Sequence, residues 1–188
     1  MIRNKIIGMI GEYPPTSGGI ATHVKEIVNV LSTKNKIILI SPSRKTSLEV
    51  FKNVEIHRVK VLRKKHFTTL TTILSPTREA FHLRNKVDLF HCHGLLSGVA
   101  SYTAKKTPLI VTVHGYATLE TIMTGRIKQN SLQFKLLRTI EKKASERADA
   151  AIAVDSSIEN FLKERLKVDE EKLFLIPNGV NIDDFTLS

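Results

Sequence analysis

Short apolar runs alternate with segments of helical periodicity from one end of the 188-residue chain to the other. The clearest runs are residues 5–11 (KIIGMIG) and 108–114 (PLIVTVH), neither of which shows the strict alternation of a half-exposed strand. Such runs are typical of parallel strands that are covered on both faces. Parallel strands need helical crossovers, so the pattern predicts an α/β domain with a Rossmann-like, three-layer α/β/α fold and a mostly parallel sheet.

We expect about seven strands, at residues 5–11, 36–41, 53–60, 87–91, 108–114, 150–154 and 173–176. Helices are expected at residues 19–31, 67–86, 94–104, 132–144 and 156–166, and the second of these is interrupted at Pro76. The apolar face expected for the 132–144 helix consists of Leu132, Leu136, Leu137, Ile140 and Ala144. Alternating apolar and polar residues at 53–60 favour a strand nearer an edge of the sheet. The sequence contains no internal repeat and no low-complexity segment, so we expect one domain over residues 1–188.

The chain is strongly basic. It has 29 Lys and Arg residues against 18 Asp and Glu residues, which gives a net charge of +11 and a pI near 9.8. This balance favours anionic partners, although a solvated Lys-rich surface would produce the same totals. Nucleic acid is disfavoured as the partner because aromatic residues make up only 6% of the chain, Trp is absent, and no recognition-helix or RNP-like pattern occurs.

Cys92 is the only cysteine, which excludes an intramolecular disulfide framework and fits a reducing compartment. The first apolar run is too short for a signal peptide, and no stretch approaches the ~20 apolar residues that span a bilayer. We therefore expect a cytoplasmic protein. A basic stretch at 58–66, followed by Leu70, Ile73 and Leu74, fits either contact with an anionic membrane surface or a solvated loop before a core-facing helix.

A glycine-containing loop follows the first predicted strand. It runs from Gly11 to Gly19 (GEYPPTSGG) and opens the first helix. Adjacent glycines allow close approach of backbone to a ligand, and a helix N-terminus favours a phosphate, although a plain turn would also use these residues. The spacing does not match the G-x-G-x-x-G dinucleotide fingerprint, and no G-K-[ST] follows, so NAD binding and ATP hydrolysis are disfavoured.

Five segments together resemble the family 4 glycosyltransferases. The first is the opening loop with Gly18-Gly19-Ile20 and His23-Val24, and the others lie at residues 87–94 (VDLFHCHG), 111–115 (VTVHG), 141–154 and 176–181 (IPNGVN). The resemblance covers nearly the whole chain. Asp155 departs from the Ser that the family more often has, and Asn181 departs from the usual Asp.

The resemblance implies the N-terminal, acceptor-side half of a GT-B glycosyltransferase. In the family a second Rossmann-like domain follows, and it holds the nucleotide-sugar and an E-x7-E motif. The sequence ends at Ser188 without that domain, so we expect the chain alone to be inactive. The implied reaction moves a sugar from a nucleotide-sugar to an unknown sugar or lipid-linked acceptor, with retained anomeric configuration, no cofactor and no obligatory metal. A GT-B nucleotide-sugar epimerase is the alternative enzyme.

The resemblance also implies roles for individual residues. Gly18 and Gly19 would lie near the donor diphosphate, and His114 would contact the transferred sugar and the acceptor hydroxyl, although it could also be a capped strand-end histidine. We place His93 and Tyr116 at the acceptor. The His91/His93 pair is disfavoured as a metal site because no third ligand is close in sequence. The central expectation is that Gly19 and His114 meet over one crevice.

Overall fold

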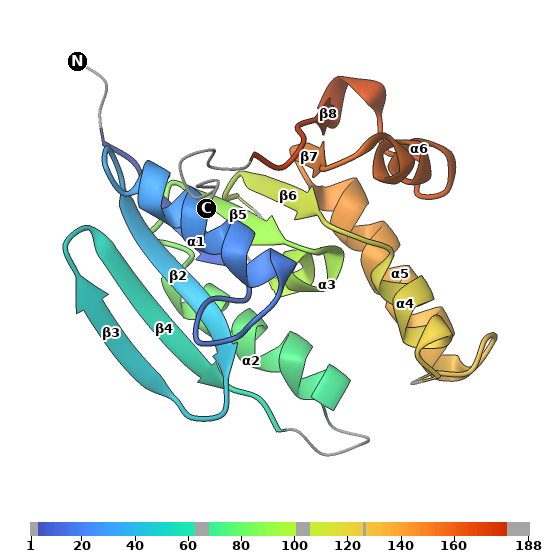
Figure 1. Cartoon of the computed structure of the whole chain (residues 1–188), viewed down its shortest axis with the longest axis horizontal. Coiled ribbons are helices and arrows are strands. Elements are labelled where there is room, and N and C mark those ends of the chain that lie inside the picture. The colour runs from blue at the N-terminus through green and yellow to red at the C-terminus, as the bar shows by residue number, and fades with distance from the viewer. Residues whose placement is uncertain (1–3, 63–67, 101–105, 126, 180–188) are drawn as a thin grey trace, which may run out of the picture.

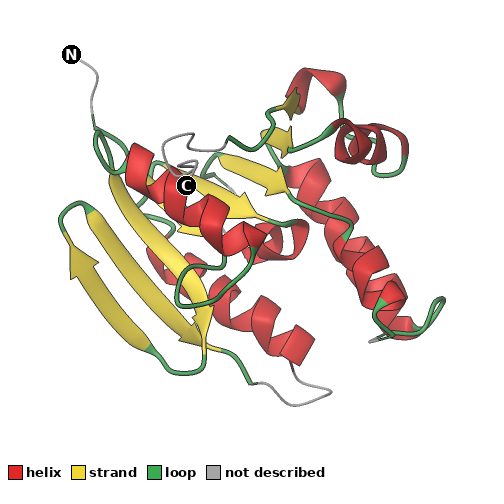
Figure 2. Ribbon diagram, viewed as in Figure 1, coloured by secondary structure: helices red, strands yellow, loops and turns green. Residues whose placement is uncertain are grey.

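The computed structural model describes residues 4–62, 68–100, 106–125 and 127–179. It has three layers, with one eight-stranded sheet between helices on both faces (Figures 1 and 2). The strand order is β3-β4-β2-β1-β5-β6-β7-β8, and all neighbouring pairs are parallel except β3 and β4. The predicted α/β class, three layers and mostly parallel sheet are therefore confirmed.

The strands are β1 (Ile6–Ile10), β2 (Lys36–Ser43), β3 (Ser47–Phe51), β4 (Val54–Lys60), β5 (Leu89–His93), β6 (Leu109–Val113), β7 (Ala150–Ala153) and β8 (Leu173–Leu175). The helices are α1 (Gly19–Leu31), α2 (Thr68–Leu83), α3 (Leu95–Gly98), α4 (Ala117–Met123), α5 (Leu132–Arg147) and α6 (Ser156–Glu164), with the short 3-10 helix η2 (Glu170–Lys172) before β8. No described helix has the length and apolar character that crossing a bilayer requires.

Two apolar clusters hold the layers together. On one face, α1 packs Val24 and Val28 against β1, β2 and β4. On the other face a larger cluster joins residues of α2, α5 and α6 to every strand from β1 to β7 except β3, with Phe90 of β5 fully buried within it. Burial of these alternating aliphatic side chains drives the sheet and its helices together.

The eighth strand, β3, corrects the predicted number of strands. It forms an antiparallel hairpin with β4 through the two-residue turn at Lys52 and Asn53, and it makes β4 the second strand from the edge. All five residues of β3 are exposed, so it contributes little apolar burial. A strand with no buried face lacks the hydrophobic signal on which the sequence prediction depended.

Three helical predictions need correction. The chain remains helical through Pro76, which lies inside α2. The α3 helix covers only Leu95–Gly98 of the predicted 94–104 segment, of which residues 101–105 lie outside the described part. In α5 the buried side chains include Leu137 and Ala144, whereas Leu132 and Leu136 are exposed, so the helix is rotated relative to the predicted apolar face.

The order of the strands locates the functional edge of the sheet. The chain moves outward from β1 to β2 in one direction and from β5 to β6 in the other, so the topology reverses between β1 and β5. Ile10 pairs with Cys92 there, and Cys92 pairs with Val111 of β6. Ligands of open α/β sheets bind beyond the carboxyl ends of the strands at such a reversal.

Candidate functional site

A crevice of about 290 Å³ lies at this reversal, beyond the carboxyl ends of β1, β5 and β6. Gly19 from the start of α1 and His114 after β6 both line it, as the sequence predicted. The described residues that line it are Gly19, Ile20, Gly94, His114, Gly115, Ala117, Glu120 and Asn178. Three glycines in this set leave backbone exposed to a bound molecule, and none of the eight residues is Lys or Arg.

The glycine loop leaves the N-terminus of α1 without a side-chain cap. Gly18 is the N-cap residue, with φ of 139° and ψ of 162°, a conformation that essentially only glycine adopts. No described side chain caps this helix end, and a Cβ at Gly18 or Gly19 would meet nothing within 4 Å. The first N–H groups of α1 are therefore accessible to an anion, which the positive end of the helix dipole would also attract.

Arg58 of β4 fixes the other end of this loop. Its guanidinium donates to the carbonyl oxygens of Tyr13 (3.3 Å) and Pro14 (2.6 Å), and it forms an ion pair with Glu49 of β3 at 2.9 Å. The residue is only 6% exposed. Arg58 therefore holds the backbone that leads to Gly18, and it is not available to the membrane surface predicted for residues 58–66. Residues 63–67 of that stretch lie outside the described residues.

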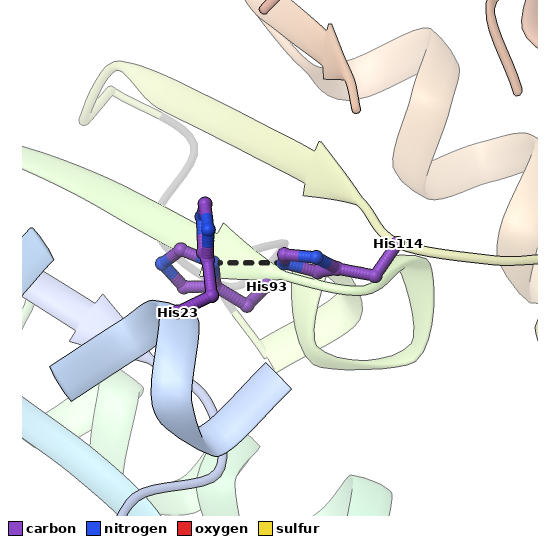
Figure 3. A group of neighbouring side chains, drawn as sticks. All are labelled: His23, His93 and His114. Carbon is purple, nitrogen blue, oxygen red and sulfur yellow. Dashed lines mark hydrogen bonds between the residues drawn. The ribbon is translucent and has the colours of Figure 1, made fainter. Parts of the chain in front are cut away.

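Three histidines gather at the crevice from three different elements (Figure 3). His23 comes from the second turn of α1, His93 ends β5 and His114 follows β6. Nδ1 of His93 lies 3.3 Å from Nε2 of His114, and the ring centroids of His23 and His114 are 4.6 Å apart. One ring nitrogen from each residue lies within 4.8 Å of the other two.

Behind this cluster, His91 supports His93. The two rings lie on the same side of β5 with centroids 4.4 Å apart, as the alternation of side chains along a strand predicts. The Nε2 atom of His91 is 2.8 Å from Oγ1 of Thr112, so the neighbouring strand holds its ring in place. His91 is therefore a positioning residue.

The histidines are neutral at physiological pH. Burial lowers the pKa of His114 to about 4, and the charge of His23 contributes in the same direction. Burial also lowers the pKa of His91 to about 4 and holds the pKa of His93 well below its ordinary value. For His23, burial lowers the pKa while a hydrogen bond with Asn178 acts in the opposite direction. Neutral imidazoles can bind hydroxyl groups or metal ions, but a pKa near 4 makes His114 a weak base.

A buried carboxyl group positions the wall of the crevice that follows His114. Glu141 of α5 is 2% exposed and accepts a hydrogen bond from the backbone N–H of Thr118 at 2.8 Å. This bond satisfies a free donor in the first turn of α4, which packs beside α5 (Figure 1). Burial raises the pKa of Glu141. Through α4, Glu141 fixes the segment that contributes Ala117 and Glu120 to the lining.

Comparison with known proteins decides the family. The family model described as Glycosyltransferase Family 4 matches residues 17–184, which is most of the chain. The chain belongs to Glycosyltransferase Family 4. An uncharacterized glycosyltransferase from Methanocaldococcus jannaschii is 28% identical to it over 203 aligned positions, which cover 97% of this chain and 50% of that protein. The family 4 chain thus spans about half the length of this curated relative.

Solved structures share the fold of the family 4 chain. Sucrose-phosphate synthase from Thermosynechococcus elongatus matches with a TM-score of 0.74 at 16% identity, over 97% of this chain and 50% of that one. A glycosyltransferase from Rickettsia africae matches with a TM-score of 0.60 at 21% identity, over 96% and 44%. The catalytic domain of starch synthase IV from Arabidopsis thaliana, bound to ADP and acarbose, matches with a TM-score of 0.61 at 12% identity, over 96% and 52%.

The predicted site residues of the family 4 chain occupy different positions relative to the crevice. Gly19 and His114 line it, and Gly18 adjoins Gly19. His93 is buried behind His114 at 2% exposure. Tyr116 is not among the lining residues, and its ring packs edge-on against Phe161 of α6 with centroids 4.6 Å apart. The predicted stacking of Tyr116 against a sugar therefore stays a prediction.

The sequence analysis assigned no role to three residues that the fold brings to the site: His23, Glu120 and Asn178. His23 lies one helical turn after Gly19, so it occupies the same side of α1 as the glycine loop. Asn178 follows the last strand, whose carboxyl end lies at the same edge of the sheet as those of β1 and β6. Asn178 could have been identified by the strand-end rule, and His23 by its helical spacing from Gly19.

Proposed function

We propose that the chain is the acceptor-side domain of a glycosyltransferase that uses a nucleotide-sugar donor, and that the crevice is its half of the active site. The observation that carries the proposal is the common crevice lined by Gly19 and His114. Gly19 provides accessible backbone N–H groups at a helix N-terminus, which suit a diphosphate. His114 provides a neutral imidazole, which suits a sugar hydroxyl.

In the proposed reaction, the acceptor oxygen forms a bond to the anomeric carbon as the bond from that carbon to the donor phosphate breaks. The acceptor proton passes to the leaving phosphate, and the configuration at the anomeric carbon is retained. Negative charge accumulates on the leaving diphosphate, where the free N–H groups of α1 would stabilise it. His114 acts by positioning, because its pKa of about 4 makes it a poor proton acceptor. No metal takes part in this scheme.

The donor would be held between two domains. The described lining of the crevice contains no cationic side chain for a diphosphate, and the chain spans about half the length of its curated relative. We propose that a second domain supplies most of the donor contacts in the complete enzyme. The 188-residue chain alone should then release no nucleoside diphosphate from UDP-, GDP- or ADP-sugars, because both sides of the cleft are needed to stabilise the transition state.

The test uses the complete enzyme with Gly19→Ala and the matched variant Thr22→Ala, an exposed position in the same helix. A Cβ at Gly19 has open space in the free protein, so the fold should be unaffected while the approach of the diphosphate is hindered. We expect kcat/KM for the donor to fall roughly tenfold to a hundredfold in Gly19→Ala and to stay unchanged in Thr22→Ala. Equal activity of both variants would refute the placement of the donor.

Product analysis separates the transferase from the alternative epimerase. With a labelled nucleotide-sugar and an acceptor mixture, transfer gives a labelled glycoside and free nucleoside diphosphate. An epimerase would instead return a labelled nucleotide-sugar epimer without any acceptor. The second result would overturn the proposed reaction while leaving the family and the fold unchanged.

A further inference from the structure

We propose that His23, His93 and His114 form a binding site for a first-row transition-metal dication of the zinc class. From the sequence alone a metal was disfavoured, because no third ligand is close to His91 and His93 in sequence. The fold supplies the missing ligands from α1 and from the end of β6, and it brings one nitrogen of each residue within 4.8 Å of the other two (Figure 3).

The spacing of one pair already matches that of two metal ligands. Zinc binds imidazole nitrogen at about 2.0–2.1 Å with tetrahedral geometry, which places neighbouring ligand atoms about 3.3–3.4 Å apart. Nδ1 of His93 and Nε2 of His114 are 3.3 Å apart. The third ligand is His23. Its ring nitrogen lies within 4.8 Å of the other two ligand nitrogens, so each of these distances has to shorten by at most about 1.5 Å to reach the same spacing. His23 is only half-buried, so a rotation of its side chain can provide this movement.

The chemistry of the three donors selects the class of ion. Neutral imidazole suits Zn²⁺, Co²⁺, Ni²⁺ and Cu²⁺, whereas Mg²⁺ and Ca²⁺ prefer oxygen ligands. In addition, the Nε2 atom of His23 is buried without a hydrogen-bond partner among the described residues, so this ring is incompletely satisfied by protein alone.

His91 is excluded as the third ligand. Its Nε2 atom is already paired with Oγ1 of Thr112, and its ring packs behind that of His93. Through this packing, His91 would help to keep the ring of His93 in orientation. Three histidine ligands leave a fourth position for water or another oxygen donor, and the crevice lined by His114 is where it would open.

Metal binding would compete with sugar binding, and this consequence rests on the proposed function. If His114 positions the transferred sugar, an ion that holds its Nε2 atom removes it from that role. Zn²⁺ should therefore inhibit the complete enzyme and not activate it. The transfer scheme itself needs no metal, so the two proposals are compatible.

The test titrates Co²⁺ into the tag-free 188-residue chain and follows the visible absorption of tetrahedral Co²⁺. We expect one ion per chain, displaced by Zn²⁺ and not by Mg²⁺. His23→Gln should weaken binding at least about tenfold, because one ligand is lost. The matched control is His82→Gln, which changes an exposed histidine on α2 and should leave binding unchanged. Circular dichroism of each variant checks that the fold is retained.

Three outcomes would overturn the proposal: no saturable binding of Co²⁺ or Zn²⁺, an octahedral spectrum unaffected by His23→Gln, or equal weakening by His82→Gln. Gly19→Ala separates the metal site from the donor site. This variant should lower kcat/KM for the donor in the complete enzyme. It should leave Co²⁺ binding intact, since a Cβ at Gly19 contacts no histidine. A chain that binds no metal would leave the proposed transferase reaction standing. A complete enzyme without transferase activity would leave the result of the Co²⁺ titration standing.

Discussion

Replacing Arg58 with Met should destabilise the protein and loosen the glycine loop. The change keeps an extended apolar side chain on β4 but removes the guanidinium, which is 6% exposed and bonded to the carbonyl oxygens of Tyr13 and Pro14. It also removes the ion pair with Glu49 and the cation–π contact with Tyr13, whose ring centroid lies 5.5 Å from the guanidinium carbon. These contacts join β3, β4 and the loop.

The magnitude follows from the contacts that are lost. Hydrogen bonds to a charged group contribute about 1.5–3 kcal/mol each, and two of them join Arg58 to loop carbonyls. Part of this is offset because the buried guanidinium no longer has to be desolvated. Glu49 is 46% exposed in its side chain, so water can solvate the carboxylate that remains. We expect a net loss of about 2–3 kcal/mol, which for a domain of this size lowers the Tm by about 4–12 °C.

Urea and thermal unfolding of Arg58→Met and Lys60→Met measure this difference. Lys60 lies two residues along the same strand and is exposed, so its replacement removes one positive charge without removing a buried contact. Hydrogen exchange should also accelerate in residues 13–19 of the Arg58 variant only. A loss below about 0.5 kcal/mol in both variants, the range typical of surface substitutions, would show that Arg58 does not hold the loop.

Three further predictions address the loop, the buried carboxyl group and the membrane. Gly18→Ala should cost about 1–3 kcal/mol because φ is 139° there, whereas Gly19→Ala should be nearly neutral in urea unfolding; equal costs would refute the conformational argument. Glu141→Gln should match the parent protein in stability near pH 4 and exceed it at pH 7. Burial raises the pKa of Glu141 in the folded state, so the carboxyl group's contribution is present at low pH and is lost as pH rises through that pKa. If the difference in unfolding free energy between Glu141→Gln and the parent protein is the same at pH 4 and pH 7, the expected direction is wrong. Finally, we propose salt-sensitive pelleting with anionic liposomes, with insertion of the exposed side chains of Leu62 and Leu74; no pelleting at low salt would remove the membrane surface as a partner.

The sequence was sufficient for the architecture because its signal comes from burial. Residues 5–11 and 108–114 are mostly apolar, and the two runs contain internal strands of the sheet, β1 and β6. The β3 strand was missed because its side chains are exposed on both sides. Leu132 and Leu136 misled the prediction for α5 in the opposite sense. Both side chains are apolar but exposed. The buried face of α5, where aliphatic residues would be expected, contains Glu141 instead.

The candidate site was only partly predictable because its residues meet through tertiary structure. The strand-end rule correctly brought Gly19 and His114 to one crevice. It could not determine that Tyr116 would pack on Phe161, since α6 lies more than 30 residues later in the chain and no local pattern links the two rings. The partner of the buried arginine was also unpredictable, although alternation along the strand places Arg58 on the same face as Val54 and Ile56. Arg58 belongs to a run of basic residues that looks solvated, and only the hairpin with β3 brings Glu49 beside it.

The distribution of charge around the crevice bears on how a donor would be held. The chain carries a net charge of +11, yet the described lining of the crevice contains one carboxylate, Glu120, and no Lys or Arg. His114 of this lining and the adjacent His93 are neutral, because burial and repulsion between the histidines disfavour the charged form. The attraction for a diphosphate on this side therefore comes from the backbone dipoles at the start of α1, a contribution of typically 0.3–1 kcal/mol that acts only within the first turn. Such a site orients a phosphate but binds it weakly. If a nucleotide-sugar binds here, as we propose, cations on the opposite side of the crevice would have to make its binding tight, so we expect firm binding only when that side closes over Gly19.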